Sequence, residues 1–416
     1  MITLIEALNY RCLRYVSQPL ERFHVLVGPN ASGKTTFLDV VAFLGRLVSD
    51  GLEAAIEERT ANFHDLVWGR EGNRFELAIE VQIPEDKRTV LPKESLDTVR
   101  YEVCVTLDER NGEPGLAREN VFLMARRPAS QVVKTLFPMP AEQPSTIVVG
   151  KAHVSQRVIT KAENDNFYSE VRKNGEKGWF PAIRLGPRKS ALANLPEDES
   201  KFPVSTWLKN LLSNGIQDIV LNSLMMRKAS PPGRVHGFRP DGSNLPWVIA
   251  ELQGKSPSRF NDWIAHIRTA LPEVEDIRTV EREDDKHRYL VIKYRAGLEV
   301  PSWMASDGTL RLLALTLLAY LPDFQGVCLI EEPENGIHPR GVDSVFESLS
   351  SVYDAQVLVA THSAVVLSLV DPRDVLCFAK NDEGATDIVR GDLHPQLRDW
   401  KGEVNLAVLF VGGVLG

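Results

Sequence analysis

FHVLVGPNASGKTT, the stretch at residues 23–36, decides the fold class of this chain. Residues 23–27 form an almost continuous apolar run, which is typical of a buried strand. Residues 34–48 place apolar side chains at helical spacing, so the loop 28–33 joins a strand to the start of a helix. In that position a G-x-x-x-x-G-K-T loop points backbone N–H groups at phosphate oxygens, and the helix adds the positive end of its dipole. This order of elements predicts an α/β fold that binds a nucleoside triphosphate.

The residue types of this loop each suit a phosphate ligand. Its glycines permit tight turns of the backbone. Lys34 would bring a positive charge to the β- and γ-phosphates, and Thr35 would offer a hydroxyl to Mg²⁺. The predicted nucleotide contacts are Gly28, Pro29, Asn30, Ala31, Ser32, Gly33, Lys34, Thr35 and Thr36.

Length and composition limit the class of protein. The chain has 416 residues, enough for two or three packed lobes, and a net charge of −8, which disfavours general nucleic-acid binding without excluding a local basic patch. Its four cysteines are far apart and form no CxxC pair, which argues against a disulfide framework or a zinc site. The first residues lack the features of a signal peptide, and the longest apolar run, 312–321, is about half a membrane span. We expect a cytoplasmic protein with no membrane partner.

Strand and helix patterns alternate at both ends of the chain, which predicts a parallel sheet with crossover helices. The expected strands are 1–6, 23–27, 75–84, 99–107, 326–331 and 356–360; the expected helices are 34–48, 308–321 and 340–353; hairpins are expected at 277–295 and 374–390. This order divides the chain into four parts. An ATPase lobe with the phosphate loop (1–75) is followed by an antiparallel β-rich part and linker (76–195). A helical insertion (196–275), broken by the Pro/Gly-rich stretch 230–247, then precedes a second ATPase lobe (276–416).

An acidic strand end is the second chemical signal. The apolar run 327–330 ends in Glu331 and Glu332, whose side chains point to opposite faces of a strand. We expect Glu331 to contribute to the Mg²⁺ site and Glu332 to act as the general base. An acidic pair that solvates the end of a strand is the alternative, and the phosphate loop in the same chain favours the catalytic role.

Two further motifs have both a functional and a structural interpretation. Ser306, Asp307, Gly308 and Thr309 begin an apolar helix, whose N-terminus can face an anion or can carry an ordinary capping residue. Taken alone, the motif favours the cap. His362 follows the strand 356–360, at the edge of the sheet where α/β proteins place ligands. A lone histidine is usually structural, but this order of motifs makes it a candidate sensor of the γ-phosphate.

Together these motifs resemble an ABC-type ATPase of the RecF/SMC/OLD group. Residues 28–35 match Walker A, 306–309 are similar to the ABC signature in an SDGT variant, 329–339 (LIEEPENGIHP) resemble the Walker B and D-loop run of OLD-like ATPases, and His362 falls at the switch histidine. Glu331 stands where an aspartate is commoner, and no glutamine near 184–190 stands out as the Q-loop residue. Tyr10 or Arg11 could stack on adenine, or either could be part of a surface turn.

The resemblance implies an ABC-ATPase head with mixed parallel and antiparallel sheets, an inserted β region and a helical arm. It also implies ATP and Mg²⁺ as cofactors and a homodimer, or a higher oligomer, that sandwiches two ATPs. Lys34, Thr35, Glu332 and His362 of one copy would then face Ser306 and Gly308 of the other. The catalytic residues would be Glu332, His362 and Lys34, and the metal ligands Thr35 and Glu331.

The role of such a site is a separate question. Only 54 residues follow His362, too few for the Toprim nuclease domain of OLD nucleases, so an effector or nuclease would be a separate chain. The resemblance suggests a DNA-linked system of anti-phage defence or repair. A nucleotide-sensing switch that binds only protein partners is the alternative, whereas the large insertion and the SDGT motif argue against a transporter ATPase. The apolar residues 406–416 would pack on the core or dock a partner.

Overall fold

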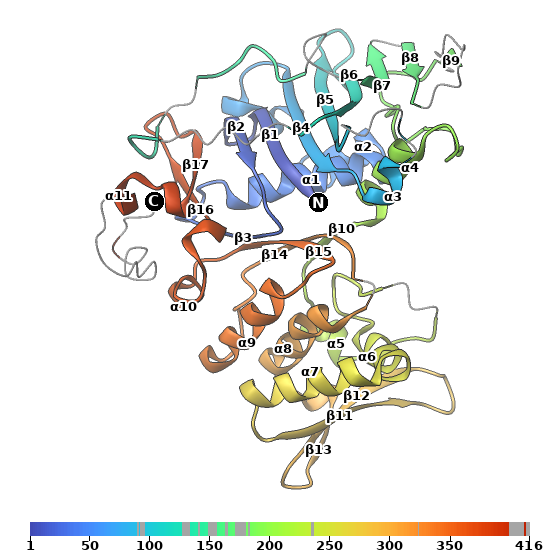
Figure 1. The fold of residues 1–416 in the computed structure, drawn as a ribbon, viewed down its shortest axis with the longest axis vertical. Helices are drawn as coiled ribbons and strands as arrows, with labels where there is room; N and C mark the ends of the chain where they lie inside the picture. Colours follow the sequence, from blue (N-terminus) through green and yellow to red (C-terminus); the bar gives the residue numbers. More distant parts are fainter. Residues whose placement is uncertain are drawn as a thin grey trace.

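The computed structural model describes residues 1–89, 91, 96–126, 134–139, 142–148, 156–162, 165–170, 180–181, 184–233, 237–322, 324–398 and 412. Three sheets organise these residues, with eight, six and three strands. The eight-stranded sheet lies in the upper part of Figure 1, and the three-stranded sheet lies in the lower part with several helices around it.

The eight-stranded sheet is antiparallel throughout. Its strands, in spatial order, are β2 (Leu13–Pro19), β1 (Ile2–Tyr10), β4 (Arg74–Gln82), β5 (Thr98–Asp108), β6 (Glu113–Met124), β7 (Gln156–Ala162), β8 (Asp165–Tyr168) and β9 (Phe180–Pro181). The predicted strands 75–84 and 99–107 are therefore confirmed as β4 and β5.

The six-stranded sheet positions the predicted site. Its order is β10 (Ile216–Ile219), β14 (Gly326–Glu331), β15 (Ala355–Ala360), β3 (Phe23–Val27), β16 (Val375–Lys380) and β17 (Thr386–Arg390). All neighbours are parallel except β16 and β17, which form the predicted hairpin. Strands far apart in the sequence thus share one sheet, and their carboxyl ends meet at one edge.

Alternate residues of these strands enter two different hydrophobic cores, as a pleated sheet covered on both faces requires. Val327 and Leu329 face the core that contains α1 (Lys34–Ser49), α2 (Leu52–Glu57) and α4 (Pro203–Asn214). Cys328 and Ile330 face the core that contains α8 (Asp307–Leu317) and α9 (Pro339–Ser350). The strand β14 therefore lies between the two halves of the molecule.

The second core extends into the lower part of the molecule. It also includes α6 (Leu245–Lys255), α7 (Pro257–Ala270) and the antiparallel strands β11 (Val274–Glu281) and β12 (Arg288–Tyr294); β13 (Glu299–Pro301) pairs with β12. The remaining helices are short: α3 (Glu85–Arg88), α5 (Ser223–Arg227), α10 (Ala364–Leu367) and α11 (Pro395–Arg398), with 3-10 turns at Phe63–Leu66, Trp68–Arg70, Ser302–Met304, Leu318–Tyr320, Pro372–Asp374 and Gly391–Leu393.

Three expectations need adjustment. Residues 216–219, predicted inside a helical stretch, form β10, because pairing with β14 outweighs the local preference. The region 196–275 is consequently tied into the central sheet and both cores, rather than extending from them as an arm. The predicted helix 308–321 is α-helical only as far as Leu317 and ends in a 3-10 turn.

Two arginines that each precede a lysine in the sequence form internal ion pairs, Arg188 with Glu113 and Arg227 with Asp307. The predicted apolar stretch 406–416 lies outside the described residues except for Gly412. No helix among the described residues is long and apolar enough to cross a membrane.

Candidate nucleotide-binding site

Three strand ends bring the predicted motifs together. The register aligns Glu331 of β14 with Ala360 of β15, and Ala360 with Leu26 of β3. The phosphate loop follows β3, Glu332 follows β14, and His362 lies two residues after β15. Since parallel strands place their carboxyl ends at one edge, the structure gathers these side chains where open α/β sheets bind ligands (Figure 1).

The two loop glycines are required by the backbone and by close neighbours. Gly28 has a φ of 150° and Gly33 a φ of 105°. A Cβ on Gly28 would lie 2.2 Å from the carbonyl oxygen of Phe378, and one on Gly33 would lie 2.3 Å from Oγ1 of Thr386. The Thr386 hydroxyl also donates to the carbonyl of Ser32 at 2.9 Å. The hairpin β16–β17 thus packs against the phosphate loop and leaves no space for a side chain at Gly28 or Gly33.

The loop has free donors that suit a phosphate. Gly33 gives α1 no side-chain cap, so the first N–H groups of the helix lack intrahelical acceptors. Ser32 Oγ is buried and has no hydrogen-bond partner among the described residues. An anion at this position would satisfy both, because a helix N-terminus favours negative charge.

Lys34 turns back over its own loop. Its Nζ donates to the carbonyls of Gly28 at 2.9 Å and Pro29 at 3.0 Å. Burial lowers the pKa of Lys34 to about 8, while Glu332 and Glu331 oppose this shift. The ammonium is therefore still mostly protonated at neutral pH, and its present partners are uncharged carbonyls, which phosphate oxygens can replace with stronger bonds.

Thr35 and Glu331 bring two side-chain oxygen groups together next to the phosphate loop. Oγ1 of Thr35 donates to Oε2 of Glu331 at 2.6 Å, and both side chains are exposed. A hydroxyl and a carboxylate are hard oxygen donors, which fit Mg²⁺. No group of three His, Cys, Asp or Glu side chains that could hold a metal occurs in the part of the chain that the structure describes.

Glu332 is held in an unusual backbone conformation beside His362. Its φ is 49°, and its N–H donates to the carbonyl of Ala360 at 2.8 Å, so the left-handed residue is fixed by the neighbouring strand. Its Oε1 lies 3.4 Å from Nε2 of His362. Burial raises the pKa of Glu332, and Lys34 opposes that rise. Burial and Lys34 lower the pKa of His362. A more basic carboxylate next to a neutral imidazole is a suitable arrangement for orienting and deprotonating water.

The signature segment occupies a different place. Ser306 caps α8 by accepting the Thr309 N–H at 3.1 Å, and Asp307 pairs with Arg227 at 2.5 Å. A Cβ on Gly308 would lie 2.2 Å from the carbonyl oxygen of Gly336. Within the described ranges, no hydrogen bond or ion pair joins Ser306, Asp307 or Gly308 to the Lys34, Glu332 and His362 group. The structural interpretation of Ser306 as a cap is thus correct in this chain, while its exposed position leaves a second role open.

The adenine-stacking interpretation of Tyr10 is wrong. The ring is fully buried, and its hydroxyl donates to Asp39 at 2.6 Å. Arg11 also binds Asp39, at 3.2 Å. Near the expected Q-loop, Ser190 donates to the buried carboxylate of Glu119 at 2.6 Å, which ties that segment to the eight-stranded sheet.

The sequence analysis missed two residues next to His362. Thr361 and Glu334 bond to one another through their side chains. The only signal for them was their position, since Glu334 lies inside the EEPEN run and Thr361 directly precedes the histidine.

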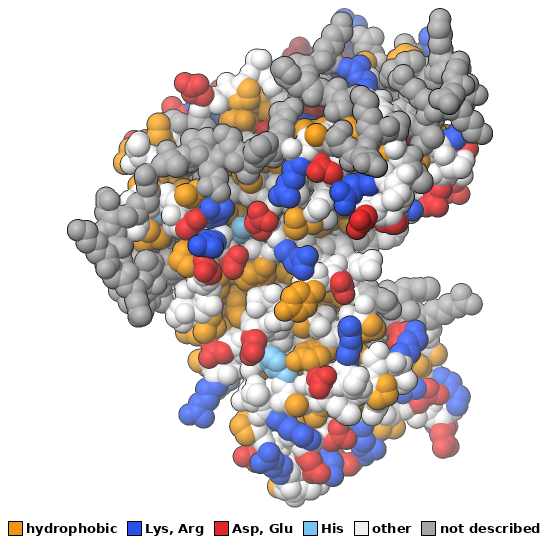
Figure 2. Space-filling view, viewed as in Figure 1, with side chains coloured by type: hydrophobic (Ala, Val, Ile, Leu, Met, Phe, Trp, Pro, Cys, Tyr) orange, Lys and Arg blue, Asp and Glu red, His pale blue; other side chains and the backbone are white. Residues whose placement is uncertain are grey.

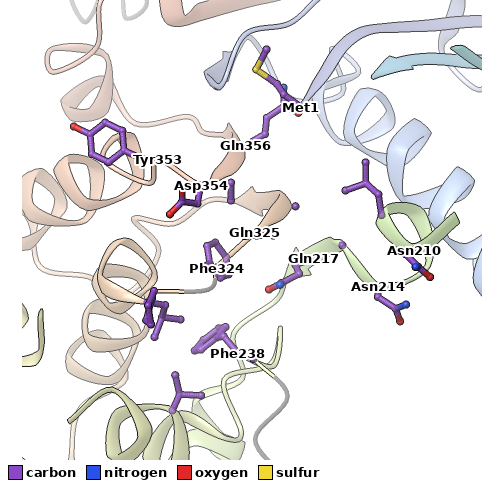
Figure 3. A pocket seen from close by; sticks show the side chains of 18 of the residues that line it. Met1, Asn210, Asn214, Gln217, Phe238, Phe324, Gln325, Tyr353, Asp354 and Gln356 are labelled. Carbon is purple, nitrogen blue, oxygen red and sulfur yellow. The ribbon is translucent and has the colours of Figure 1, made fainter. Parts of the chain in front are cut away.

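A cavity of 880 Å³ lies at the opposite edge of the six-stranded sheet, where β10, β14 and β15 begin. Figure 3 shows Gln217, Phe238 and Phe324 around it. Its lining includes none of the phosphate-loop residues, so it is separate from the site described above.

Comparisons with known proteins agree with this fold. The structure resembles an SMC head bound to the C-winged-helix domain of ScpA, with 14% identity, a TM-score of 0.55, and 93% of this chain and 97% of that chain covered. It also resembles an SMC head domain with an extended coiled coil, bound to the C-terminal domain of ScpA from Pyrococcus furiosus, with 14% identity, a TM-score of 0.50, and coverage of 93% and 95%. At this identity the likeness shows the fold alone, which is that of an SMC head domain.

Two sequence comparisons add to this. Protein ea59 of Escherichia phage lambda is 24% identical over 257 residues, 56% of this chain and 46% of that protein, so the chain spans about half the length of this relative. The model of a family described as "AAA domain, putative AbiEii toxin, Type IV TA system" matches residues 23–98 and 142–368. The match covers most of the chain and both halves of the strand-end site, and the chain belongs to this family of AAA ATPase domains.

Proposed function

We propose that this chain binds ATP with Mg²⁺ and hydrolyses it. The observation that carries the proposal is the convergence of Lys34, the Thr35–Glu331 pair and the Glu332–His362 pair at one edge of a parallel sheet. The loop N–H groups and Lys34 hold the phosphates, and Thr35 and Glu331 hold the metal, which neutralises charge on the phosphates. Glu332 orients and deprotonates the attacking water, and His362 faces the γ-phosphate.

The active form in this proposal is a homodimer that encloses two ATPs. Its support is that the interactions at the N-terminus of α8 are with Thr309 and Arg227, and that within the described residues no hydrogen bond or ion pair links Ser306 or Asp307 to the phosphate loop of the same chain. Ser306 and Asp307 are exposed, so the N-terminus of α8 is available to a phosphate held by a second copy. The ABC-type head fold is compatible with such pairing.

Turnover with Mg-ATP tests the proposed chemistry directly. Purified protein should release phosphate, and Glu332→Gln should reduce kcat by roughly 100-fold or more while it still binds ATP, because only the base is lost. Glu299→Gln, which changes a surface carboxylate on β13, is the matched control and should leave kcat unchanged. ATP binding without turnover by the unaltered chain would contradict the proposal of hydrolysis and favour the nucleotide-sensing switch.

We also propose that a separate effector chain responds to this ATPase in a DNA-linked system of defence or repair. The family description, which names a toxin–antitoxin system, and the phage relative support this context. Among the described residues on the face shown in Figure 2, acidic and basic side chains are interspersed. We therefore expect any DNA contact to be local. Measuring turnover with and without duplex DNA at low salt distinguishes the two roles: DNA raises it in the first and has no effect on a switch that binds only protein.

A further inference from the structure

The turn between β14 and α9 contains a half-buried glutamate, Glu334, that the proposed chemistry does not use. Glu334 accepts a short hydrogen bond from the Thr361 hydroxyl on its Oε1. Its Oε2 is buried and has no hydrogen-bond partner among the described residues. Burial, the largest effect, raises the pKa of Glu334, while the hydrogen bond from Thr361 opposes that rise. A carboxylate oxygen that is buried without a partner costs stability, so stability does not explain its presence.

Thr361 connects this carboxylate to the backbone on both sides of His362. The Thr361 side chain is fully buried, and its Oγ1 accepts the N–H of Ser363 at 2.9 Å. The backbone N–H of Thr361 donates to the carbonyl of Leu26 at 3.1 Å, two residues before the phosphate loop. The residues that precede and follow His362 are thus fixed to one another and to β3.

These hydrogen bonds of Thr361 fix the backbone around His362 and so determine where its imidazole can lie. His362 Nε2 is 3.4 Å from Oε1 of Glu332, a contact that a small shift of the backbone would break. Glu332 and Glu334 belong to the same turn after β14. The hydrogen bond that the Thr361 hydroxyl donates to Glu334 therefore also fixes the distance between this turn and the segment that contains His362.

We propose that Glu334 and Thr361 are positioning residues that hold His362 against Glu332. The proposal rests on the proposed function, because His362 and Glu332 act on ATP only if the chain hydrolyses it. Glu334 and Thr361 act through His362 and do not contact the nucleotide.

A double-mutant cycle on turnover tests this. Thr361→Val keeps the shape of the side chain and removes the hydroxyl, whereas Thr361→Ser keeps the hydroxyl. We expect Thr361→Val to lower kcat ~10-fold with KM for Mg-ATP unchanged within about 2-fold, and Thr361→Ser to restore most of the loss. In a His362→Ala background, Thr361→Val should have no further effect, because the residue that it positions is gone. A full ~10-fold effect in that background, or an effect on KM alone, would overturn the proposal.

A second readout keeps the proposal testable if the chain does not turn over ATP. The imidazole pKa of His362 can be followed by NMR, with its signal identified by its absence in His362→Ala. The Glu334 carboxylate raises the pKa of His362 through its charge, and Thr361→Val keeps that charge. We therefore expect the His362 pKa to change in Thr361→Val, where the imidazole is displaced, and not in Glu299→Gln. A thermal melt of each variant checks that it is folded. If the His362 pKa is the same in Thr361→Val and the unaltered chain, the positioning role is wrong, whatever the turnover assay shows.

Discussion

Gly308→Ala tests whether ATP hydrolysis requires the N-terminus of α8 to stay in its present position. A Cβ at this residue would lie 2.2 Å from the carbonyl oxygen of Gly336, whereas real Cβ contacts essentially never fall below 3.0 Å. The start of α8 or the turn at Gly336 must therefore move by at least the difference, about 0.8 Å. Backbone faces backbone here, so the strain should cost about 1–3 kcal/mol of unfolding free energy.

The functional effect should exceed the stability effect. Ser306 lies two residues before Gly308 and moves with it, and a misplacement of about 1 Å at a reacting group costs roughly 100-fold in rate. We expect kcat for ATP hydrolysis to fall roughly 10- to 100-fold in Gly308→Ala, with ATP binding to the phosphate loop unchanged. A coupled phosphate-release assay measures the rate, and a fluorescent ATP analogue measures binding.

Gly254→Ala is the matched control. Gly254 lies in α6, and a Cβ there would meet nothing within 4 Å. This substitution should leave turnover unchanged and stabilise the helix by about 0.5–1 kcal/mol. If Gly308→Ala has the turnover and stability of the unaltered chain, the close contact between α8 and the turn is wrong.

Three further predictions follow from other parts of the chain. Burial lowers the pKa of His24 to about 4, so the folded state favours the neutral imidazole. The contribution of His24 to the free energy of unfolding should have its full value above pH 6.5 and fall by about 3 kcal/mol as the pH drops to 4. Urea unfolding of His24→Asn should therefore show a flatter pH dependence. Arg100 is buried among the carboxylates of Glu6, Glu80 and Glu102. Arg100→Met leaves these carboxylates without their cation, so it should lower the free energy of urea unfolding at pH 7 by about 3–5 kcal/mol. A loss below about 1 kcal/mol would contradict the role of these ion pairs. Thr35→Ala should weaken ATP binding roughly 10-fold in Mg²⁺ but not in EDTA, and an equal loss in both would exclude Thr35 as a metal ligand.

The sequence predicted the parts of the site that follow from local pattern and order along the chain. The phosphate loop, the strand that ends at Glu331 and the strand before His362 were predicted within a residue or two. Parallel pairing then brought them to one edge, because the strand–helix alternation permits few other arrangements.

The features that depend on tertiary packing were not predictable. The strand β10 forms only because the edge of β14 is available to it, and the burial of Tyr10 depends on Asp39 of α1, which accepts a hydrogen bond from its hydroxyl. The bond between Glu334 and Thr361 joins residues 27 positions apart that meet only after β14 and β15 pair. No periodicity or spacing in the sequence marks contacts of this kind.

In the proposed active form, each ATP is enclosed by two copies of the chain. Light scattering on Glu332→Gln measures this directly, because the variant should bind Mg-ATP and be unable to hydrolyse it. With Mg-ATP we predict a particle of twice the 46.4 kDa chain mass, and with ADP a single chain. Adding Ser306→Arg, which fills the exposed end of α8, should abolish the ATP-dependent dimer but not ATP binding. A Glu332→Gln variant that stays monomeric with ATP bound, or that dimerises equally without nucleotide, would contradict the claim.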